Sequence, residues 1–199
     1  AHEFNNPLHG ILGFAQHLQD ETDPAVINEY SREIVRLAKR LSEMTKGLNL
    51  YARTGQPTEL TAVKIPQLID DAVRMAAFST ILDEVTVIRD YKPVPDFQAH
   101  SSELQQVFVN LIINAEQAML GAHGRGTLIL RSWHEPEHDV VKLEVSDDGP
   151  GVPPDVQAKI FDPFFTTKEV GKGTGLGLTV AYAIAQEHGG RLSVASSGG

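Results

Sequence analysis

Asp147-Asp148-Gly149-Pro150-Gly151 is the stretch of the sequence that most constrains the fold. The alternating run Val140–Ser146 before it predicts a strand, so Asp147 stands at a strand end. The glycines let the backbone turn sharply and approach a bound molecule closely, and the Asp147 carboxylate is a hydrogen-bond acceptor at that place. A strand-to-loop turn alone would explain an Asp-Gly pair. The interpretation therefore depends on the segments around it.

A second glycine-rich segment lies downstream, Gly171-Lys172-Gly173-Thr174-Gly175-Leu176-Gly177-Leu178. It leads into an apolar pattern that predicts a helix over Leu176–His188, ended by Gly189-Gly190. Glycines before a helix present free N–H groups and the positive end of the helix dipole to phosphate. The spacing fits neither the dinucleotide fingerprint nor the Gly-Lys-Ser/Thr loop of P-loop proteins, so both of those classes are rejected.

Two asparagines, Asn110 and Asn114, lie upstream in a predicted helix that opens near Ser102, which has capping-box spacing to Gln105. Residues four apart on a helix share one face, so both amides project together beside Gln117. Such a pair taken alone is better explained as a cap or as a bond to a neighbouring loop. Together with the two glycine segments it predicts the polar face of a nucleotide site.

The N-terminal part of the chain carries a helical apolar stripe in two pieces. The first piece consists of Phe4, Leu8, Ile11, Ala15 and Leu18, and after a short turn the second runs from Ile27 to Tyr51. In the turn, Asp23 can cap the second helix and Pro24 can occupy its first turn. A hairpin of two helices cannot cover both stripes alone, so we expect two copies to close a four-helix bundle. The alternative is that the stripe packs on the rest of the chain.

The remainder of the chain alternates between helical and strand patterns. Thr54-Gly55-Gln56-Pro57 breaks the second helix, and the fold class is α+β: a helical hairpin at 1–55, then a layer of helices and strands at 56–199. Beyond those named above, the expected elements are a helix and three strands, Ile65–Ala77, Val85–Asp90, Thr127–Trp133 and Arg191–Ala195. The run Thr127–Trp133 should pair antiparallel with Val140–Ser146 around the turn Glu135–Asp139.

Composition narrows the function classes. The formal charge of −9 argues against a general nucleic-acid binder, and the absence of cysteine removes disulfides and thiolate zinc sites. No run approaches the roughly 18 apolar residues of a transmembrane helix, and no signal pattern opens the chain. We therefore expect a cytoplasmic fragment without membrane contact of its own, and this leaves open whether sensor or membrane segments lie outside it.

The motifs in order resemble one protein family. Asn110–Ala115, Asp147–Gly151, Ile160–Phe165 and Gly173–Leu178 look like the N, G1, F and G2 boxes of sensor histidine kinases, and His2–Leu8 resembles their H box. With the hairpin these segments cover essentially the whole chain. The family resemblance implies a dimerising hairpin with a phosphoacceptor histidine. It also implies, at 56–199, an ATP-binding α/β sandwich with a mixed β-sheet, shared with Hsp90, type II topoisomerases and MutL proteins.

The resemblance also implies roles for residues. Asp147 would accept the adenine amino group, Asn114 would ligate Mg²⁺, and the stretch 162–174 would form a lid over ATP. The other expected nucleotide contacts lie in the same boxes: Asn110, Gln117, Gly149, Gly151, Lys168, Lys172, Gly173, Thr174, Gly175, Leu176 and Gly177. Two departures from the family pattern are visible. His100 stands where many relatives have Asp before the N box, with Ser101 or Ser102 as substitute caps, and the usual last strand is missing after Arg191–Ala195.

The same resemblance favours kinase over ATPase. Relatives that hydrolyse ATP carry a glutamate four residues before the metal-binding asparagine, and Asn110 occupies that position here. His2 is then the expected nucleophile, Glu3 can take its ring proton, and Asn6 one turn later suits dephosphorylation of a response regulator. The prediction is autophosphorylation of His2 from Mg-ATP and transfer to a response-regulator aspartate. The alternatives are a nucleotide-binding switch or scaffold without autokinase activity, and an ATPase of the same superfamily.

Overall fold

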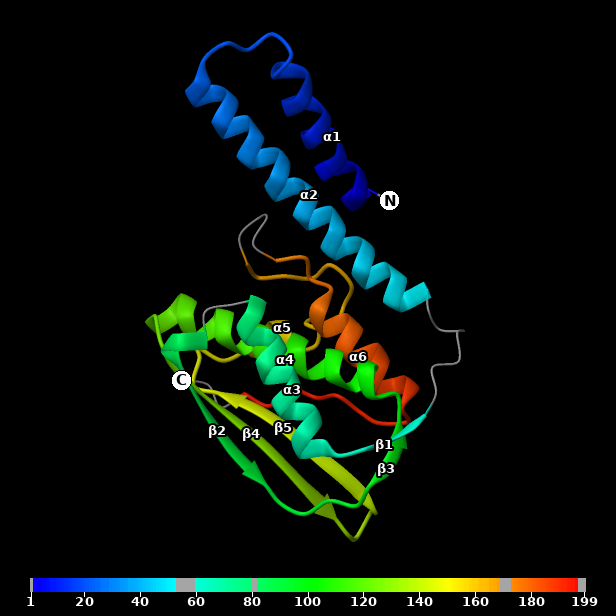
Figure 1. The fold of residues 1–199 in the computed structure, drawn as a ribbon. Helices are drawn as coiled ribbons and strands as arrows, with labels where there is room; N and C mark the ends of the chain where they lie inside the picture. Colours follow the sequence, from blue (N-terminus) through cyan, green and yellow to red (C-terminus); the bar gives the residue numbers. More distant parts are fainter. Residues whose placement is uncertain (1, 53–59, 80–81, 169–172, 197–199) are drawn as a thin grey trace. The chain divides into compact units, whose positions relative to one another are not determined.

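The computed structural model describes residues 2–52, 60–79, 82–168 and 173–196 (Figure 1). The chain packs as two compact units, residues 1–55 with 163–176 and residues 56–162 with 177–199. The division into a 1–55 hairpin and a 56–199 sandwich remains a prediction. None of the helices in the described parts of the chain is both long enough and apolar enough to cross a membrane.

The first unit contains the predicted helical hairpin, made of α1 (His2–His17) and α2 (Pro24–Ala52). The predicted cap of α2 is confirmed, because the Ala25 N–H donates to Asp23 Oδ1 at 2.8 Å and Pro24 opens the helix. A side-chain acceptor before the first turn satisfies one N–H that has no partner within the helix. The turn residues therefore determine where α2 begins.

Large apolar side chains lie both inside and outside this hairpin, and Leu8 of the predicted stripe is among those outside. Inside, the rings of Phe14 and Tyr30 lie 5.3 Å apart between centroids. Leu37 is also buried there, and a Cβ built at Gly10 would lie 2.8 Å from its Cδ1 atom, so glycine permits the close approach of α1 to α2. Leu8 and Leu12, one helical turn apart on α1, remain 56% and 55% exposed.

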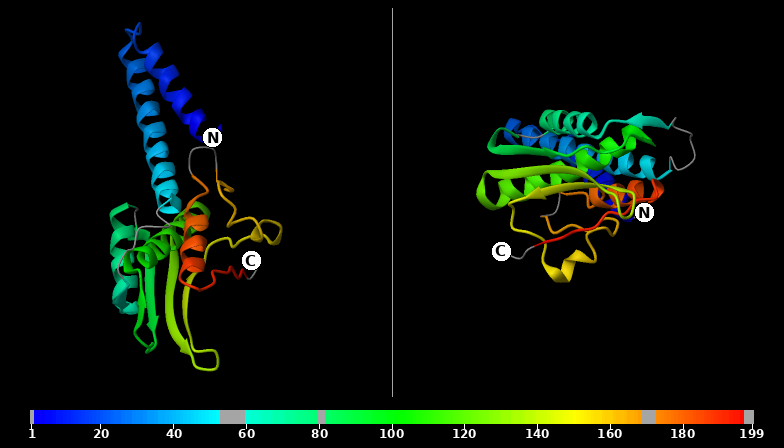
Figure 2. Two further views of the ribbon diagram at one scale, coloured as in Figure 1. Left: turned by 90° about the vertical axis from the view of Figure 1, so that its right-hand side faces the viewer. Right: turned by 90° about the horizontal axis from the view of Figure 1, so that it is seen from below.

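The second unit is a layer of helices on one face of a sheet. The helices are α3 (Ile65–Ser79), α4 (Ser101–His123) and α6 (Gly177–Glu187), and the strands are β2 (Val85–Tyr91), β4 (Gly126–Glu135) and β5 (Val140–Asp147) (Figures 1 and 2). β2 pairs parallel with β4, which pairs antiparallel with β5, so the predicted mixed sheet and hairpin are confirmed. A parallel pair needs a crossover, and α4 lies in that connection.

Four short elements were not predicted from the sequence. They are β1 (Thr61–Val63), which pairs antiparallel with β3 (Phe97–Ala99), the 3₁₀ helix η1 (Leu82–Glu84), and α5 (Pro154–Gln157). Each has only three or four residues. Such a length is too short to show either the alternation of a strand or the periodicity of a helix.

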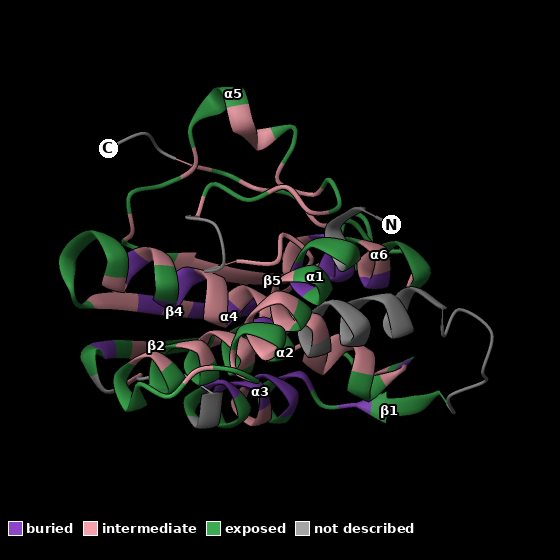
Figure 3. Ribbon diagram, turned by 90° about the horizontal axis from the view of Figure 1, so that it is seen from above, coloured by how far each residue is buried: buried purple, intermediate pink, exposed green. Residues whose placement is uncertain are grey.

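The core of this unit lies between the sheet and α3 and α4. Both helices place buried residues against the strands (Figure 3), and the largest fully buried apolar side chains are Ile65, Ile69, Ile112, Met119, Leu128 and Leu130. Gly126 opens β4 directly against Met119, where a Cβ would collide with the methionine side chain. Leu128 and Leu130 alternate along β4, as expected for a strand with one buried face.

Two predictions for this unit are wrong. Arg191–Ala195 forms no strand, although its residues alternate between exposed and half-buried, because no ladder of backbone bonds joins it to β5 among the described residues. The α4 helix begins at Ser101, with His100 as its N-cap and no capping side-chain bond, so neither Ser101 nor Ser102 substitutes for the missing Asp. The capping-box spacing in the sequence has no counterpart at this helix start.

The start of α4 is instead held by the end of α6. The His100 N–H donates to His188 Nε2 at 3.2 Å, and His188 Nδ1 donates to the Ile184 carbonyl at 2.8 Å. Because the backbone groups fix which nitrogen accepts and which donates, His188 is the neutral Nδ1–H tautomer in this arrangement. The two imidazole rings meet edge to face, with centroids 5.4 Å apart. A histidine from one helix thus supplies the acceptor that the other helix start lacks.

We expect His188→Ala to lower the free energy of unfolding by about 1–2 kcal/mol, because it leaves a helix-start N–H without its acceptor. Urea unfolding monitored by circular dichroism measures the change. His138→Ala is the matched control, since its ring contacts Glu135 in an exposed turn and contributes little. Equal midpoints for the two variants would contradict the role given to His188.

Candidate functional site

The two asparagines of α4 meet the start of α6. Asn110 Nδ2 donates to the Gly177 carbonyl at 2.9 Å, and Gln106 Nε2 donates to Asn110 Oδ1 at 2.8 Å. A Cβ built at Gly177 would lie 3.6 Å from Asn114 Nδ2 and 3.8 Å from Asn110 Cγ, so the first residue of α6 lies beside both amides. The structure brings the predicted site residues Asn110, Asn114 and Gly177 together. Sequence reasoning missed Gln106, which stands one turn before Asn110 on the same face.

Both asparagines are half-buried, whereas the predicted third member of the face, Gln117, is exposed. The Asn110 amide uses its oxygen for Gln106 and one N–H for Gly177, so it joins α4 to α6. As a nucleotide contact Asn110 remains a prediction, and so do Asn114 and Gln117.

The loop after β5 holds Asp147 in a defined orientation. Its Oδ1 accepts the Gly149 N–H at 2.9 Å, and a Cβ at Gly149 would lie 2.6 Å from that oxygen. Gly149 also lies against α4, 3.5 Å from Ala118 Cβ by the same construction. A side chain at position 149 would therefore displace the Asp147 carboxylate, which is expected to accept the adenine amino group. The Asp147 side chain stands at the surface, accessible to a ligand.

The far end of this loop is fixed by a residue that sequence reasoning did not single out. Gly151 has a φ of 74°, which favours glycine, and a Cβ there would lie 2.5 Å from Ser196 Oγ. The Val152 N–H donates to the same hydroxyl at 2.9 Å. Ser196 thus closes the loop from the side of the C-terminal segment, and no motif in the sequence marks it.

The glycine segment divides between the two compact units. Gly173, Thr174, Gly175 and Leu176 belong to the first, whereas Gly177 begins α6 in the second. In the first unit the Phe164 N–H donates to the Gly175 carbonyl at 3.0 Å, and both residues have a positive φ, 67° and 65°. A Cβ at Gly175 would collide with the Phe164 backbone, so this close approach requires glycine.

Of the predicted lid, the structure describes residues 162–168 and 173–174. The Lys168 N–H donates to Thr166 Oγ1 at 3.2 Å, and the Leu176 N–H donates to Thr174 Oγ1 at 3.4 Å. Lys172 lies outside the described residues. The phosphate contacts predicted for this segment stay predictions.

The predicted phosphoacceptor stands in the first turn of α1. The backbone of His2 and Glu3 is helical, and their side chains lie outside the described part of the chain. Asn6 follows one turn after His2 with an exposed side chain, and Pro7 behind it is buried. The helix therefore places His2 and Asn6 on one face, as the sequence predicts, while their chemistry remains a proposal.

The donor groups suit a cation held largely by its substrate. The described residues contain no group of three or more His, Asp or Glu side chains able to hold a metal ion. Mg²⁺ commonly takes one or two protein oxygens and completes its shell with phosphate and water, so the single Asn114 amide oxygen fits that ion. Mg²⁺ at Asn114 remains a proposal.

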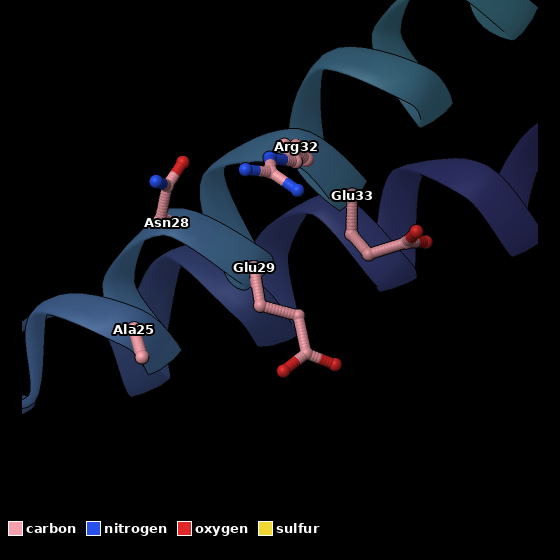
Figure 4. A pocket seen from close by; sticks show the side chains of 5 residues that line it. All are labelled: Ala25, Asn28, Glu29, Arg32 and Glu33. Atoms are coloured by element: carbon pink, nitrogen blue, oxygen red, sulfur yellow. The ribbon is translucent and has the colours of Figure 1, made fainter.

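A shallow pocket on α2 is separate from these residues. Five side chains of one helix line it, Ala25, Asn28, Glu29, Arg32 and Glu33, and none is a predicted site residue (Figure 4). Glu33 accepts two hydrogen bonds from Arg36, the nearer at 2.6 Å, and this contact raises the pKa of the Arg36 guanidinium. The pocket is a depression between solvated charges and carries no chemistry of its own.

The comparisons with known proteins agree with this arrangement. Residues 99–199 match the family described as histidine kinase-, DNA gyrase B-, and HSP90-like ATPase, and residues 1–57 match the His Kinase A (phospho-acceptor) domain. The sensory histidine kinase/phosphatase NtrB of Rhodobacter capsulatus is 34% identical over 100% of this chain. The chain spans 57% of that relative's length.

Solved structures show the same fold. The histidine kinase AdeS of Acinetobacter baumannii is 22% identical with a TM-score of 0.66, covering 94% of this chain and 86% of that one. The histidine kinase ThkA, solved in complex with the response regulator protein TrrA, is 23% identical with a TM-score of 0.69, covering 96% of this chain and 53% of that one. The family assignment rests on both family matches and on the likeness to NtrB: the chain belongs to the sensor histidine kinases of two-component systems.

Proposed function

We propose that this chain is the catalytic core of a homodimeric histidine kinase, with a dimerisation and phosphotransfer hairpin at 1–55 and an ATP-binding domain at 56–199. The observation that carries the proposal is the convergence of Asn110 and Asn114 with Gly177, where the glycine-rich segment enters α6. The Asn114 amide, proposed to hold a cation, and a helix start suited to phosphate meet there. Asp147, held by the Gly149 N–H, supplies the acceptor for the adenine amino group.

The proposed reaction uses groups of the chain at each step. A ring nitrogen of His2 attacks the γ-phosphorus of ATP, and the N–P bond forms as the bond to the β–γ bridging oxygen breaks, leaving ADP. Glu3 takes the proton that the imidazole releases. Asn114 would hold Mg²⁺, which offsets phosphate charge when bound. The phosphoryl group then passes from His2 to an aspartate of a response regulator, the partner class that the ThkA complex exemplifies.

A phosphatase activity toward the regulator is a second proposal. Its support is Asn6, whose exposed amide stands one turn after His2, together with the kinase/phosphatase name of the NtrB relative. An amide at that place can align water against a phosphorylated aspartate.

The autokinase proposal predicts that His2→Ala loses all label from γ-labelled ATP, while the wild type carries an acid-labile, alkali-stable phosphoryl group. His9→Ala is the matched control, because His9 is exposed two turns later on the same helix. ADP affinity should stay unchanged in both variants. Label retained on His2→Ala would refute His2 as the acceptor, and a wild type that binds ADP without labelling would favour a switch or scaffold.

Substitutions at Asn110 test whether the chain is a kinase rather than an ATPase. We expect Asn110→Glu to raise the ratio of released phosphate to phosphohistidine, because a carboxylate one turn before Asn114 can activate water. Asn110→Gln is the matched control, since it has the same length and keeps an N–H donor for the Gly177 carbonyl. Both are compared at saturating ATP, after their affinities have been measured. Equal ratios would show that the missing carboxylate does not restrain hydrolysis.

The dimer proposal depends on apolar surface that a single hairpin leaves open. Leu8 and Leu12 share one face of α1 and are more than half exposed, whereas Leu37 is already buried inside the hairpin. Unpaired apolar faces of this kind are covered by a second hairpin in four-helix bundles.

We therefore expect Leu12→Glu to shift the protein from dimer to monomer in sedimentation equilibrium, because dimerisation would bury an unpaired charge. Val35→Glu is the control: Val35 is 54% exposed, but two residues from Leu37 it points away from the hairpin interior. A dimer that survives Leu12→Glu, or one that Val35→Glu dissociates equally, would place the interface elsewhere.

A further inference from the structure

Asp148, the residue directly after β5, contacts both β4 and α4 beside Asp147, which is proposed to bind the adenine base. Asp148 follows Asp147 directly, and its Oδ1 accepts the Thr127 N–H at the start of β4, at 2.8 Å. Its main-chain carbonyl lies 3.2 Å from Nε2 of His123, the last residue of α4. Because a carbonyl oxygen can only accept, His123 Nε2 carries the proton in this contact.

The contacts stand where the β4–β5 ladder ends. Leu128 is paired with Asp147 in the antiparallel register, and Thr127 has no further ladder partner on β5. The Asp148 carboxylate accepts the Thr127 N–H in place of a ladder partner. His123 contacts the main-chain carbonyl of Asp148 and so connects the same residue to α4. The Gly124 N–H turns back to the Leu120 carbonyl at 3.0 Å, so the helix end that carries His123 is itself closed.

From this geometry we infer that His123 and Asp148 are positioning residues that aim the Asp147 carboxylate at the adenine amino group. The inference rests on the proposed nucleotide site. Asp147 has one carboxylate oxygen bound to the Gly149 N–H, so the direction of the other follows the backbone of residues 147–149. His123, Asp148 and Thr127 hold that backbone on one side, and Ser196 closes the loop on the other at Val152.

The solvent exposure of these contacts separates positioning from stability. His123 and Asp148 are exposed, and hydrogen bonds between exposed groups contribute little to the free energy of unfolding. The hydrogen bonds of His123 and Asp148 can nevertheless restrict the motion of the loop after β5, which few other contacts among the described residues hold. The hydrogen bond from the Thr127 N–H lowers the pKa of the Asp148 carboxyl, so the carboxylate that accepts this bond persists throughout the neutral pH range.

The test compares two nucleotides that differ at the group Asp147 is proposed to read. Inosine diphosphate has an oxo group where adenosine diphosphate has the amino group, so the ratio of their affinities, measured by titration calorimetry on the whole chain, reports the aim of Asp147. We expect Asp148→Ala to weaken ADP binding roughly five- to tenfold and inosine diphosphate binding far less. His123→Ala should act in the same direction, with the unfolding midpoint unchanged in both variants.

Conservative and control variants complete the design. Asp148→Asn keeps an oxygen for the Thr127 N–H and should restore the wild-type ratio. Asp96→Ala removes an exposed carboxylate elsewhere, and His134→Ala removes a histidine that contacts Asp139 at the opposite end of the β4–β5 hairpin, 3.0 Å away. Neither control should change the ratio.

The possible failures are distinguishable. A parallel loss of both affinities in Asp148→Ala, or an unchanged ADP affinity, overturns the positioning role while leaving the nucleotide site intact. A wild type that binds no ADP, or an Asp147→Ala variant that keeps the full preference for ADP, refutes the proposed role of Asp147 itself.

Discussion

The hydrogen bond from Asn110 Nδ2 to the Gly177 carbonyl is the constraint on which the candidate site depends. It fixes the first residue of α6 to the middle of α4, and His188 fixes the other end of α6 to the first turn of α4 through the His100 N–H. Two helices pinned at both ends cannot slide past each other without losing both bonds. The glycine segment therefore enters α6 at a fixed position opposite Asn114.

Glycine permits close packing against α4 at two other places. A side chain at Gly149 would displace the Asp147 carboxylate, and one at Gly126 would collide with Met119. In both cases the small residue allows a polar group or a strand to approach α4 closely. At Gly177 a Cβ would make only ordinary van der Waals contact with the amides of Asn110 and Asn114, so the position of α6 there follows from the hydrogen bond and not from steric exclusion.

Much of this architecture follows from the sequence. The long helices and the β4–β5 hairpin have strong periodicity, and their existence and approximate bounds were predictable from pattern alone. The shared face of Asn110 and Asn114 followed from their helical spacing. Their grouping with Gly177 followed from the family resemblance, because nothing local links residues so distant in the chain. His188, Ser196 and Gln106 could not be found this way, since a cap supplied by another helix, or a hydroxyl that closes a distant loop, leaves no local signal. The strand expected at Arg191–Ala195 shows the converse: an alternating pattern is necessary for a strand but does not provide a partner.

The parallel pairing of β2 with β4 has a consequence for how the second unit acquires its structure. Residues of α4 lie between the two strands in the sequence, so this pairing closes a long loop, whereas the α1–α2 hairpin is built from contacts between neighbours in the sequence. The hairpin can form as soon as its own residues are available. The face of α4 that carries Asn110 stays uncovered until α6, far downstream, has been synthesised and docks on it. During synthesis on the ribosome, the residues of the hairpin are thus complete before those that complete the proposed nucleotide site, because α6 is the last of the described helices.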